Sequence, residues 1–273
     1  MKTKKQTVLI TGATSGIGYE FAHIFAEKGY DLFLASRDRE RLASIQTRFG
    51  DLYGIAVTTM PVDLAKPGVA RKVYEETIRQ KIDIQVLVNN AGFGIAGEHV
   101  DLDRLRVEEM IQLNVTSLTE MCSLFGAEMK KRKSGHILNV ASTAAYQPVP
   151  YIAAYGATKS YVLNFSEALA MEMEDYGVSV TCLSPGPTDT KFFDSVGIEG
   201  LAEKKTGIWA KNNRMESRQV AQIGVEALFA GKMSLVAGNW NSLFAFSSRL
   251  APRKATAGIS KRIMKQATRE ERS

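Results

Sequence analysis

The sequence has little cysteine and histidine. Its two cysteines, Cys122 and Cys182, form no CxxC pair, and its three histidines, His23, His99 and His136, are scattered along the chain. Neither spacing is that of a metal site or a disulfide framework. We therefore expect no bound metal, reduced and buried thiols, and a cytoplasmic protein.

Long apolar runs are also absent. Near the amino terminus, Val8 to Ile10 are the only consecutive strongly apolar residues, which is too few for an export signal. The longest apolar candidate, residues 233–248, carries no charge, but it contains glycine, asparagine and serine and is too short to span a bilayer. With an apolar fraction of 45%, the chain can still bury a large core.

Positive charge is concentrated in residues 249–273. This segment has eight basic residues and two acidic ones, so it accounts for the whole net charge of +6. It follows an apolar stretch that contains Trp240, Leu243, Phe244 and Phe246. Two interpretations remain open: a solvated helix that ends the fold, or a weak contact with an anionic membrane surface or an acidic partner. No nucleic-acid partner is predicted.

Short apolar segments alternate with longer segments of helical periodicity. The predicted strands are 7–10, 31–35, 55–59, 85–88, 136–140, 178–183 and 234–236, and the predicted helices are 18–28, 39–49, 69–80, 102–131, 154–176 and 217–230. This order predicts βαβ units. We expect an α/β fold with a Rossmann-like, doubly wound parallel sheet of about seven strands and helices on both faces. Residues 1–248 are predicted to form one domain, followed by a basic tail, 249–273.

The first predicted strand ends in a glycine-rich turn, LITGATSGIG. Glycines at positions 12, 16 and 18 let the backbone approach a pyrophosphate, and the helix amino terminus that follows favours its negative charge. The spacing is TGxxxGxG rather than GxGxxG. A tight turn without a ligand also needs glycine, so the motif alone leaves both interpretations open.

The end of the second strand indicates which dinucleotide is bound. Ser36 and Arg37 occupy the turn, and a basic side chain there accommodates the 2′-phosphate of NADP, so NADP(H) is favoured over NAD(H). Asp38 is either a ribose ligand or the N-cap of the next helix. Arg39 and Arg41 are expected to be solvated.

Polar residues follow two further strands. Asp63 is suited to accept a hydrogen bond from an adenine amino group, and the small residues of Asn89-Asn90-Ala91-Gly92 leave room for a nucleotide. Each has a simpler interpretation, Asp63 as a turn former and the two asparagines as a polar loop.

Tyr155 and Lys159 are four residues apart in a predicted helix and so share one face. A nearby positive charge favours a phenolate, which suits the tyrosine to proton exchange. A surface pair is the alternative. Ser142 ends a strand 13 residues before Tyr155, and Asn114 is a poor helix former within a predicted helix, where it marks either a special role, a kink or an exposed position.

Together these segments resemble the short-chain dehydrogenase/reductase family, in order and spacing, from about residue 7 to residue 236. The matching motifs are Thr11-Gly12-x-x-x-Gly16-x-Gly18, Asp63, Asn89-Asn90-Ala91-Gly92, Asn114, Ser142, Tyr155-x-x-x-Lys159 and Pro185-Gly186-Pro187-Thr188. The resemblance implies a catalytic set of Asn114, Ser142, Tyr155 and Lys159. It implies a cofactor site that contains Gly12, Thr14, Ser15, Gly16, Ile17, Gly18, Arg37, Asp63, Asn90, Ala91, Gly92, Tyr155, Lys159, Pro185, Gly186 and Thr188.

The same resemblance implies a role for each catalytic residue. Tyr155 is expected to be the general acid/base, and Ser142 to steady the substrate oxygen. Lys159 is expected to lower the tyrosine pKa and to bind the nicotinamide ribose. Asn114 is expected to hold a water of a proton relay, and the segment 185–188 to flank the nicotinamide.

The substrate is predicted from the residues after these motifs. Apolar side chains in 188–215 suit a mobile lid, namely Phe192, Phe193, Ile198, Leu201, Trp209 and Met215, and the segment after Ser142 adds Tyr146, Val149, Pro150 and Tyr151 to the expected pocket wall. An apolar ketone, aldehyde or secondary alcohol is favoured. One alternative is that these side chains only pack the lid. The alternative functions are a 3-oxoacyl-carrier-protein reductase and a non-catalytic NADP-binding sensor or adaptor. Family habit implies a homodimer or homotetramer through the helices 102–131 and 154–176.

Overall fold

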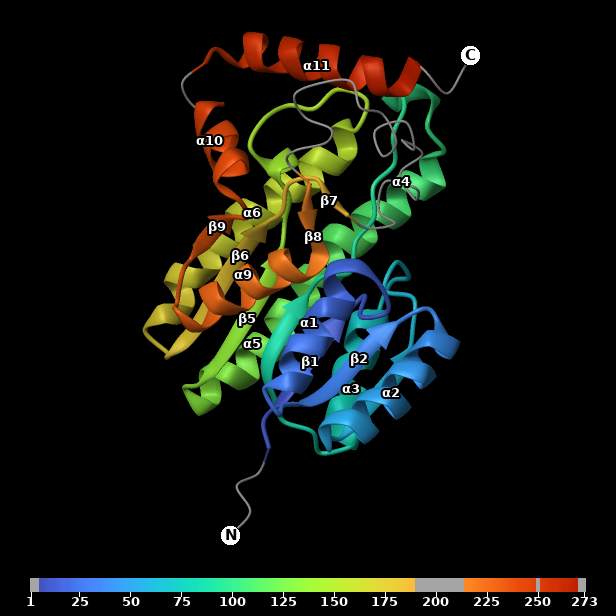
Figure 1. The fold of residues 1–273 in the computed structure, drawn as a ribbon, viewed down its shortest axis with the longest axis vertical. Helices are drawn as coiled ribbons and strands as arrows, with labels where there is room; N and C mark the ends of the chain where they lie inside the picture. The colour runs from blue at the N-terminus through green and yellow to red at the C-terminus, as the bar shows by residue number, and fades with distance from the viewer. Residues whose placement is uncertain (1–4, 190–213, 249–250, 270–273) are drawn as a thin grey trace.

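Seven parallel strands form the central sheet. We describe a computed structural model, which covers residues 5–189, 214–248 and 251–269. The strand order is β3-β2-β1-β4-β5-β6-β9 (Figure 1). The strands are β1 Thr7–Thr11, β2 Asp31–Ser36, β3 Val57–Pro61, β4 Ile84–Asn89, β5 Gly135–Val140, β6 Val178–Ser184 and β9 Ser234–Val236. The predicted fold class is confirmed. The third strand begins two residues later than expected, because Val57 is the residue that pairs with Leu32 of β2.

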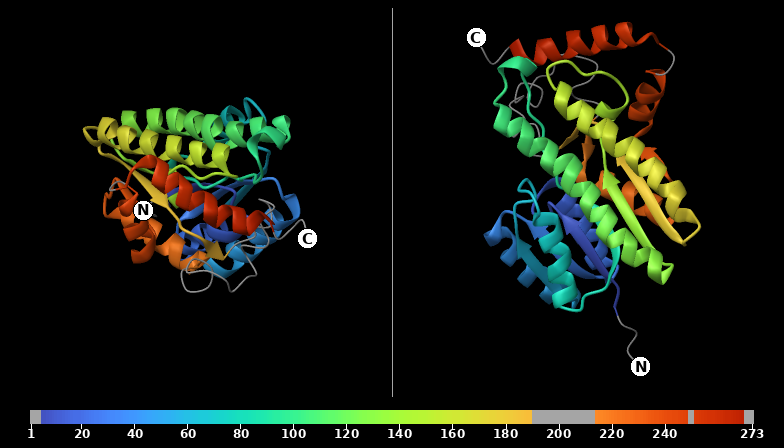
Figure 2. Two further views of the ribbon diagram at one scale, coloured as in Figure 1. Left: turned by 90° about the horizontal axis from the view of Figure 1, so that it is seen from above. Right: turned by 180° about the vertical axis from the view of Figure 1, so that it is seen from behind.

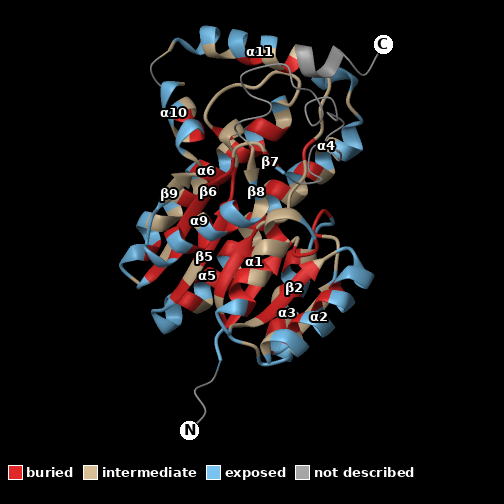
Figure 3. Cartoon of the chain, in the orientation of Figure 1, coloured by how far each residue is buried: buried red, intermediate tan, exposed pale blue. Residues whose placement is uncertain are grey.

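Helices cover both faces of this sheet, which explains why its strands are apolar throughout rather than alternating. In β1, Val8 and Ile10 pack against one helix layer, and Leu9 packs against the other. The first layer consists of α1 Gly16–Glu27, α2 Arg39–Tyr53 and α9 Ser217–Phe229, and the second of α3 Val69–Arg79, α5 Leu118–Arg132 and α6 Ala153–Glu174. Figure 2 shows the layers from two further sides, and Figure 3 shows the buried sheet between them.

The predicted helix 102–131 is not α-helical throughout. It consists of α4 Arg104–Ile111, a π-helical segment Gln112–Ser117, and α5. Hydrophobic periodicity does not distinguish these parts, because the π segment adds one residue per turn without ending the helix. Asn114 lies in the π segment, and its contacts are described with the site below.

Two further helices follow β9, α10 Asn239–Ser247 and α11 Arg253–Arg269. α11 lies across the end of the molecule toward which the strands point (Figure 1). A second, small parallel sheet pairs β7 Thr188–Asp189 with β8 Met215–Glu216. Within the described ranges, no helix is both long enough and apolar enough to cross a membrane.

A buried polar network joins β4, β5, α5 and α6 beneath the carboxyl ends of the strands. The Asn139 side chain accepts a hydrogen bond from Asn89 Nδ2 at 2.9 Å and donates to Ser166 Oγ at 2.9 Å. Asn89 Nδ2 also contacts Cys122 Sγ at 3.2 Å. Cys122 and Cys182 are both buried and unpaired, and burial raises the pKa of each thiol to about 12. The prediction of buried thiols is confirmed.

Candidate active site

One cavity of about 540 Å³ opens at the carboxyl ends of the strands, a size typical of ligand sites. All of the predicted cofactor-binding residues line it: Gly12, Thr14, Ser15, Gly16, Ile17, Gly18, Arg37, Asp63, Asn90, Ala91, Gly92, Tyr155, Lys159, Pro185, Gly186 and Thr188. Ser142 lines it too, and Asn114 does not. Parallel strands explain this convergence, because motifs that follow different strands all end at one edge of the sheet.

The glycine-rich turn has the conformation that close contact with a phosphate needs. Gly12 and Gly16 have φ values of 66° and 51°, in the left-handed region that glycine favours. A side chain at Gly18 would collide with the carbonyl oxygen of Gly12. α1 begins at Gly16, and Ser15 before it makes no side-chain cap, so the first amides of the helix face the cavity without a competing side-chain acceptor. These residues therefore fit a dinucleotide pyrophosphate.

Asn90 and Thr11 hold this turn in place. Thr11 Oγ1 accepts hydrogen bonds from the backbone amides of Asn90 and Ala91, both at 3.0 Å. The Asn90 side-chain amide donates to the carbonyl oxygens of Thr11 at 3.0 Å and Gly12 at 3.2 Å. The contacts join β1 to β4, where the strand order reverses, which is the position at which open α/β sheets bind ligands.

The end of β2 places one cation at the cavity. Arg37 is exposed and lines the cavity, and among the described residues its guanidinium has no hydrogen-bond or ion-pair partner. Asp38 accepts a hydrogen bond from Arg41 N at 3.0 Å, which confirms the N-cap interpretation. Arg39 and Arg41 are exposed and lie outside the cavity lining.

Asp63 stabilises the turn after β3 and also lines the cavity. Its carboxylate accepts a hydrogen bond from Ala65 N at 3.1 Å, as the simpler interpretation predicts. It also lines the cavity, so both of the alternatives are compatible with its position.

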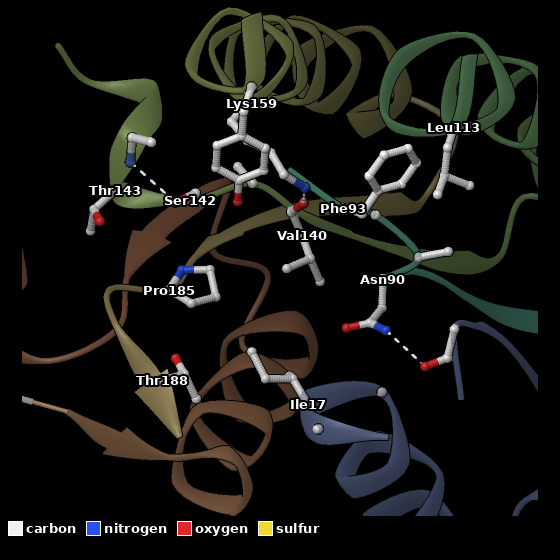
Figure 4. A pocket seen from close by; sticks show the side chains of 18 of the residues that line it. Ile17, Asn90, Phe93, Leu113, Val140, Ser142, Thr143, Lys159, Pro185 and Thr188 are labelled. Atoms are coloured by element: carbon white, nitrogen blue, oxygen red, sulfur yellow. Dashed lines mark hydrogen bonds between the residues drawn. The ribbon is translucent and has the colours of Figure 1, made fainter. Parts of the chain in front are cut away.

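Tyr155, Lys159 and Ser142 meet at one wall. Both α6 side chains are almost fully buried, with exposed fractions of 7% for Tyr155 and 5% for Lys159. Lys159 Nζ donates a hydrogen bond to the Val140 carbonyl oxygen at 2.8 Å and lies 5.8 Å from the centre of the Tyr155 ring. Figure 4 shows Lys159 pointing down toward Val140, with Phe93 beside it. The interpretation as a surface pair is therefore wrong.

Burial dominates the electrostatics of this pair. It raises the pKa of Tyr155 to about 12, and the hydrogen bond with Ser142 offsets this only in part. Burial also lowers the pKa of Lys159 to about 8. In the protein by itself, desolvation therefore outweighs any effect of the ammonium on the phenol. The lowering of the Tyr155 pKa by Lys159 together with a bound oxidised nicotinamide stays a prediction.

Asn114 binds protein groups on both sides of the site. Its Nδ2 donates to the Phe93 carbonyl oxygen at 2.9 Å and to Thr158 Oγ1 at 3.1 Å, and its Oδ1 accepts from Phe93 N at 3.2 Å. Thr158 Oγ1 in turn donates to the Tyr155 carbonyl oxygen at 2.7 Å. The side chain is buried, so the alternative of an exposed asparagine is wrong. Asn114 ties the loop after β4 to the helix that carries Tyr155.

The segment after β6 is held against the segment after β5 and against α10. The Pro185 carbonyl oxygen accepts a hydrogen bond from Thr143 N at 2.9 Å, and Thr188 Oγ1 donates to the Gly186 carbonyl oxygen at 3.0 Å. A side chain at Gly186 would collide with Asn241 of α10. Close packing therefore explains the glycine, whose φ is not positive.

The predicted pocket wall is only partly correct. Of the four side chains expected after Ser142, Val149 lines the cavity, whereas Tyr146, Pro150 and Tyr151 do not. Tyr146 instead donates a hydrogen bond to Ser184 Oγ at 3.3 Å. The expected lid residues Phe192, Phe193, Ile198, Leu201 and Trp209 lie outside the described residues. Met215 packs against the first helix layer.

Several apolar lining residues carry no motif and were not predicted. Phe93 and Leu113 come from the chain between β4 and α5, and Phe244, Ile263 and Met264 come from α10 and α11. For α11 the sequence holds a weak signal, since residues 256, 260, 263 and 264 recur at helical spacing and lack charge.

Comparison with known proteins identifies the family. Residues 6–199 match the family model described as short chain dehydrogenase. The chain belongs to the short-chain dehydrogenase/reductase family. Members are oxidoreductases that use a nicotinamide cofactor and act on small molecules.

Three similar proteins illustrate the family. A very-long-chain 3-oxoacyl-CoA reductase of Pyrenophora tritici-repentis is 34% identical over 230 residues, which are 74% of this chain and 67% of that protein. A short-chain dehydrogenase from Sphingobium yanoikuyae, solved with NADPH, has a TM-score of 0.76 at 30% identity and covers 90% of this chain and 94% of its own. A bulky-bulky ketone specific alcohol dehydrogenase from Comamonas testosteroni has a TM-score of 0.74 at 25% identity, with coverages of 91% and 94%.

Proposed function

We propose that this short-chain dehydrogenase/reductase interconverts an apolar ketone or aldehyde and the corresponding alcohol with NADP(H). The observation that carries the proposal is that Tyr155, Ser142 and Lys159 line one cavity together with the glycine-rich turn. The phenol of Tyr155 and the hydroxyl of Ser142 thus line the same cavity as the turn that fits a dinucleotide pyrophosphate.

The chain's own groups supply the proton chemistry. The bound nicotinamide provides a hydride for the carbonyl carbon. Tyr155 Oη protonates the substrate oxygen, and the Ser142 hydroxyl stabilises the charge that develops there. Since burial keeps the pKa of Tyr155 at about 12, the phenol is protonated before the reaction and serves as an acid. Lys159 binds the nicotinamide ribose in this proposal, which its position in the cavity lining and its hydrogen bond to the Val140 carbonyl oxygen support.

Asn114 is a positioning residue in this proposal. It fixes Thr158, which holds the backbone of Tyr155, and it fixes the backbone of Phe93. Its predicted role as the holder of a relay water stays a prediction.

The cofactor preference gives a direct test of the Arg37 assignment. We expect Arg37→Gln to lower kcat/KM with NADPH by about tenfold. A charge-assisted hydrogen bond contributes about 1.5–3 kcal/mol, and the proposed bond between Arg37 and the 2′-phosphate should be at the lower end because Arg37 is exposed. The value with NADH should change little. Arg39→Gln, on an exposed residue outside the cavity, is the matched control. Equal losses with both cofactors would show that Arg37 does not contact a 2′-phosphate.

The substrate class is tested by NADPH oxidation with a panel of ketones, 3-oxoacyl thioesters and sugars, with NADH alongside. We expect turnover of apolar ketones. The 34% identical 3-oxoacyl-CoA reductase makes acyl thioesters the second candidate. Nucleotide binding without turnover of any compound would favour the sensor or adaptor instead.

We make two further proposals about the outer surface, a membrane contact and an oligomer interface. Trp240, Leu243 and Phe246 are exposed on α10, the first of them by 71%, and the next helix in the chain, α11, carries the exposed cations Lys254, Lys261 and Arg262. Exposed apolar side chains and cations on consecutive helices suit a weak contact with an anionic membrane surface. Sedimentation with anionic and neutral vesicles tests this contact. Light scattering tests the predicted homodimer or homotetramer through α5 and α6.

A further inference from the structure

The cavity has a wall that the family motifs do not provide. Phe244 of α10 and Ser260, Ile263 and Met264 of α11 line it. These residues lie beyond the matched segment 6–199. In Figure 1, α11 crosses the open end of the fold, whereas the amino end of α1 lies below it. The C-terminal helix is thus placed at the end of the cavity away from the glycine-rich turn.

α11 has two distinct faces. Its inner face carries the buried side chains Ser260 and Met264, and its outer face carries the exposed residues Ile259, Lys261 and Arg262. The buried side chains of the inner face are uncharged. The positive charge of this segment therefore lies on its outer face and not on the face toward the cavity. The helix that ends the fold is thus solvated on its outer face, whereas its inner face is buried.

Met264 anchors this inner face. It packs against Ala96, in the loop after β4, and against Val149, Tyr151 and Ile152, in the segment before α6. That loop and that segment are themselves joined, because Gly97 N donates a hydrogen bond to the Tyr151 carbonyl oxygen at 2.8 Å. The contacts fix α11 to the segment that leads directly into the helix of Tyr155.

Ser260 adds one polar group to this apolar wall. Its side chain is only 5% exposed, and among the described residues its hydroxyl has no hydrogen-bond partner. Its oxygen is not one of the fully buried atoms without a partner, so it keeps accessible surface in the cavity that Ser260 lines. A hydroxyl that opens into an otherwise apolar wall is suited to bind a polar atom of a ligand.

We propose that α11 forms the distal wall of the substrate site, and that Ser260 hydrogen-bonds a second oxygen function at the far end of a bulky, otherwise apolar ketone. Ile263 and Met264 contact the apolar body of that substrate. The inference rests on the proposed reductase function and names the substrate class for it. It assigns specificity to the basic C-terminal segment as well as to the residues after Ser142.

Three ketones test the inference in the full-length protein with NADPH. Cyclohexanone is small enough to react without reaching α11. Androstanone is a bulky apolar ketone, and androsterone carries the same ketone with a hydroxyl at the opposite end of the ring system. Binding of both steroids is also measured by calorimetry, so that the readout does not depend on turnover alone.

We expect Ser260→Ala to raise KM for androsterone about three- to tenfold with kcat unchanged, because it removes a contact made equally before and during the reaction. Androstanone should be unaffected. We expect Met264→Trp to weaken the binding of both steroids at least tenfold, since added bulk in a packed wall is not tolerated. Ile259→Trp places the same bulk on the outer face of α11, where Ile259 is 52% exposed, and should change nothing.

The outcomes separate the two levels of the proposal. If cyclohexanone and the steroids are all left unreduced by the unaltered protein, the proposed function fails. If cyclohexanone is reduced but neither steroid binds, or if Ser260→Ala and Met264→Trp leave steroid binding unchanged, the assignment of α11 is overturned.

Discussion

Replacing Tyr155 with phenylalanine should lower kcat by about 10²–10⁴-fold, which is the usual contribution of a positioned general acid. The hydroxyl is the only group removed, and the ring that fills the buried wall remains. NADPH affinity, measured by fluorescence titration, should therefore change little.

The matched control for this experiment is Tyr161→Phe, which removes a hydroxyl from the same helix. Tyr161 points away from the cavity and pairs with Thr119 Oγ1 at 3.1 Å. We expect it to retain full activity. Turnover of Tyr155→Phe at the level of the unaltered protein would refute the assignment of the acid.

Replacing Lys159 with methionine should have opposite effects on activity and stability. Activity should fall by about 10²–10³-fold, as on loss of one preorganised electrostatic contact. Stability should rise, because the shift of the Lys159 pKa from 10.5 to about 8 corresponds to an unfavourable free energy of about 3 kcal/mol at neutral pH. Loss of the hydrogen bond to the Val140 carbonyl oxygen offsets part of this gain. We expect a net increase of about 1–2 kcal/mol, measured by denaturant unfolding.

The pH dependence gives this prediction a definite sign. Below pH 8 the lysine is charged in both the folded and the unfolded chain, so the methionine variant has its full advantage. Between pH 8 and 10.5 the unfolded chain binds more protons than the folded one, and the unaltered protein gains stability as pH rises. The advantage should shrink by about 1 kcal/mol between pH 7 and 9.

Lys72→Met is the control for removal of a lysine charge, since Lys72 is exposed on α3. It should change stability by no more than a few tenths of a kcal/mol at either pH. A Lys159→Met variant that unfolds more readily than the unaltered protein at pH 7 would contradict the buried, desolvated ammonium.

Much of the fold was predictable because each strand lies within an apolar run that ends in turn residues. The first residue of β3 was not predictable. Ile55 is apolar and buried like a strand residue, but the pairing with β2 begins only at Val57. The π segment at Asn114 was not predictable either. What stabilises it is a contact with Phe93, which lies 21 residues earlier in the chain.

The site was predictable in position, whereas its electrostatics and its far wall were not. Motifs after parallel strands converge at one edge of the sheet, so their cavity followed from the chain order. The raised pKa of Tyr155 depends on burial, which a helical spacing of four residues does not reveal. The role of Met264 depends on Ala96 and Val149, more than 100 residues away in sequence.

The Asn89–Asn139 contact has a consequence for engineering this protein. The two residues are paired in the register of β4 and β5, and a slip of one position would turn their side chains to opposite faces. The register of β4 and β5 thus determines the position of Ser142 relative to Asn90 along the strand direction. The segment 143–152, which follows Ser142, can accordingly be exchanged to alter the range of compounds accepted, while Ser142 and Asn90 keep their alignment.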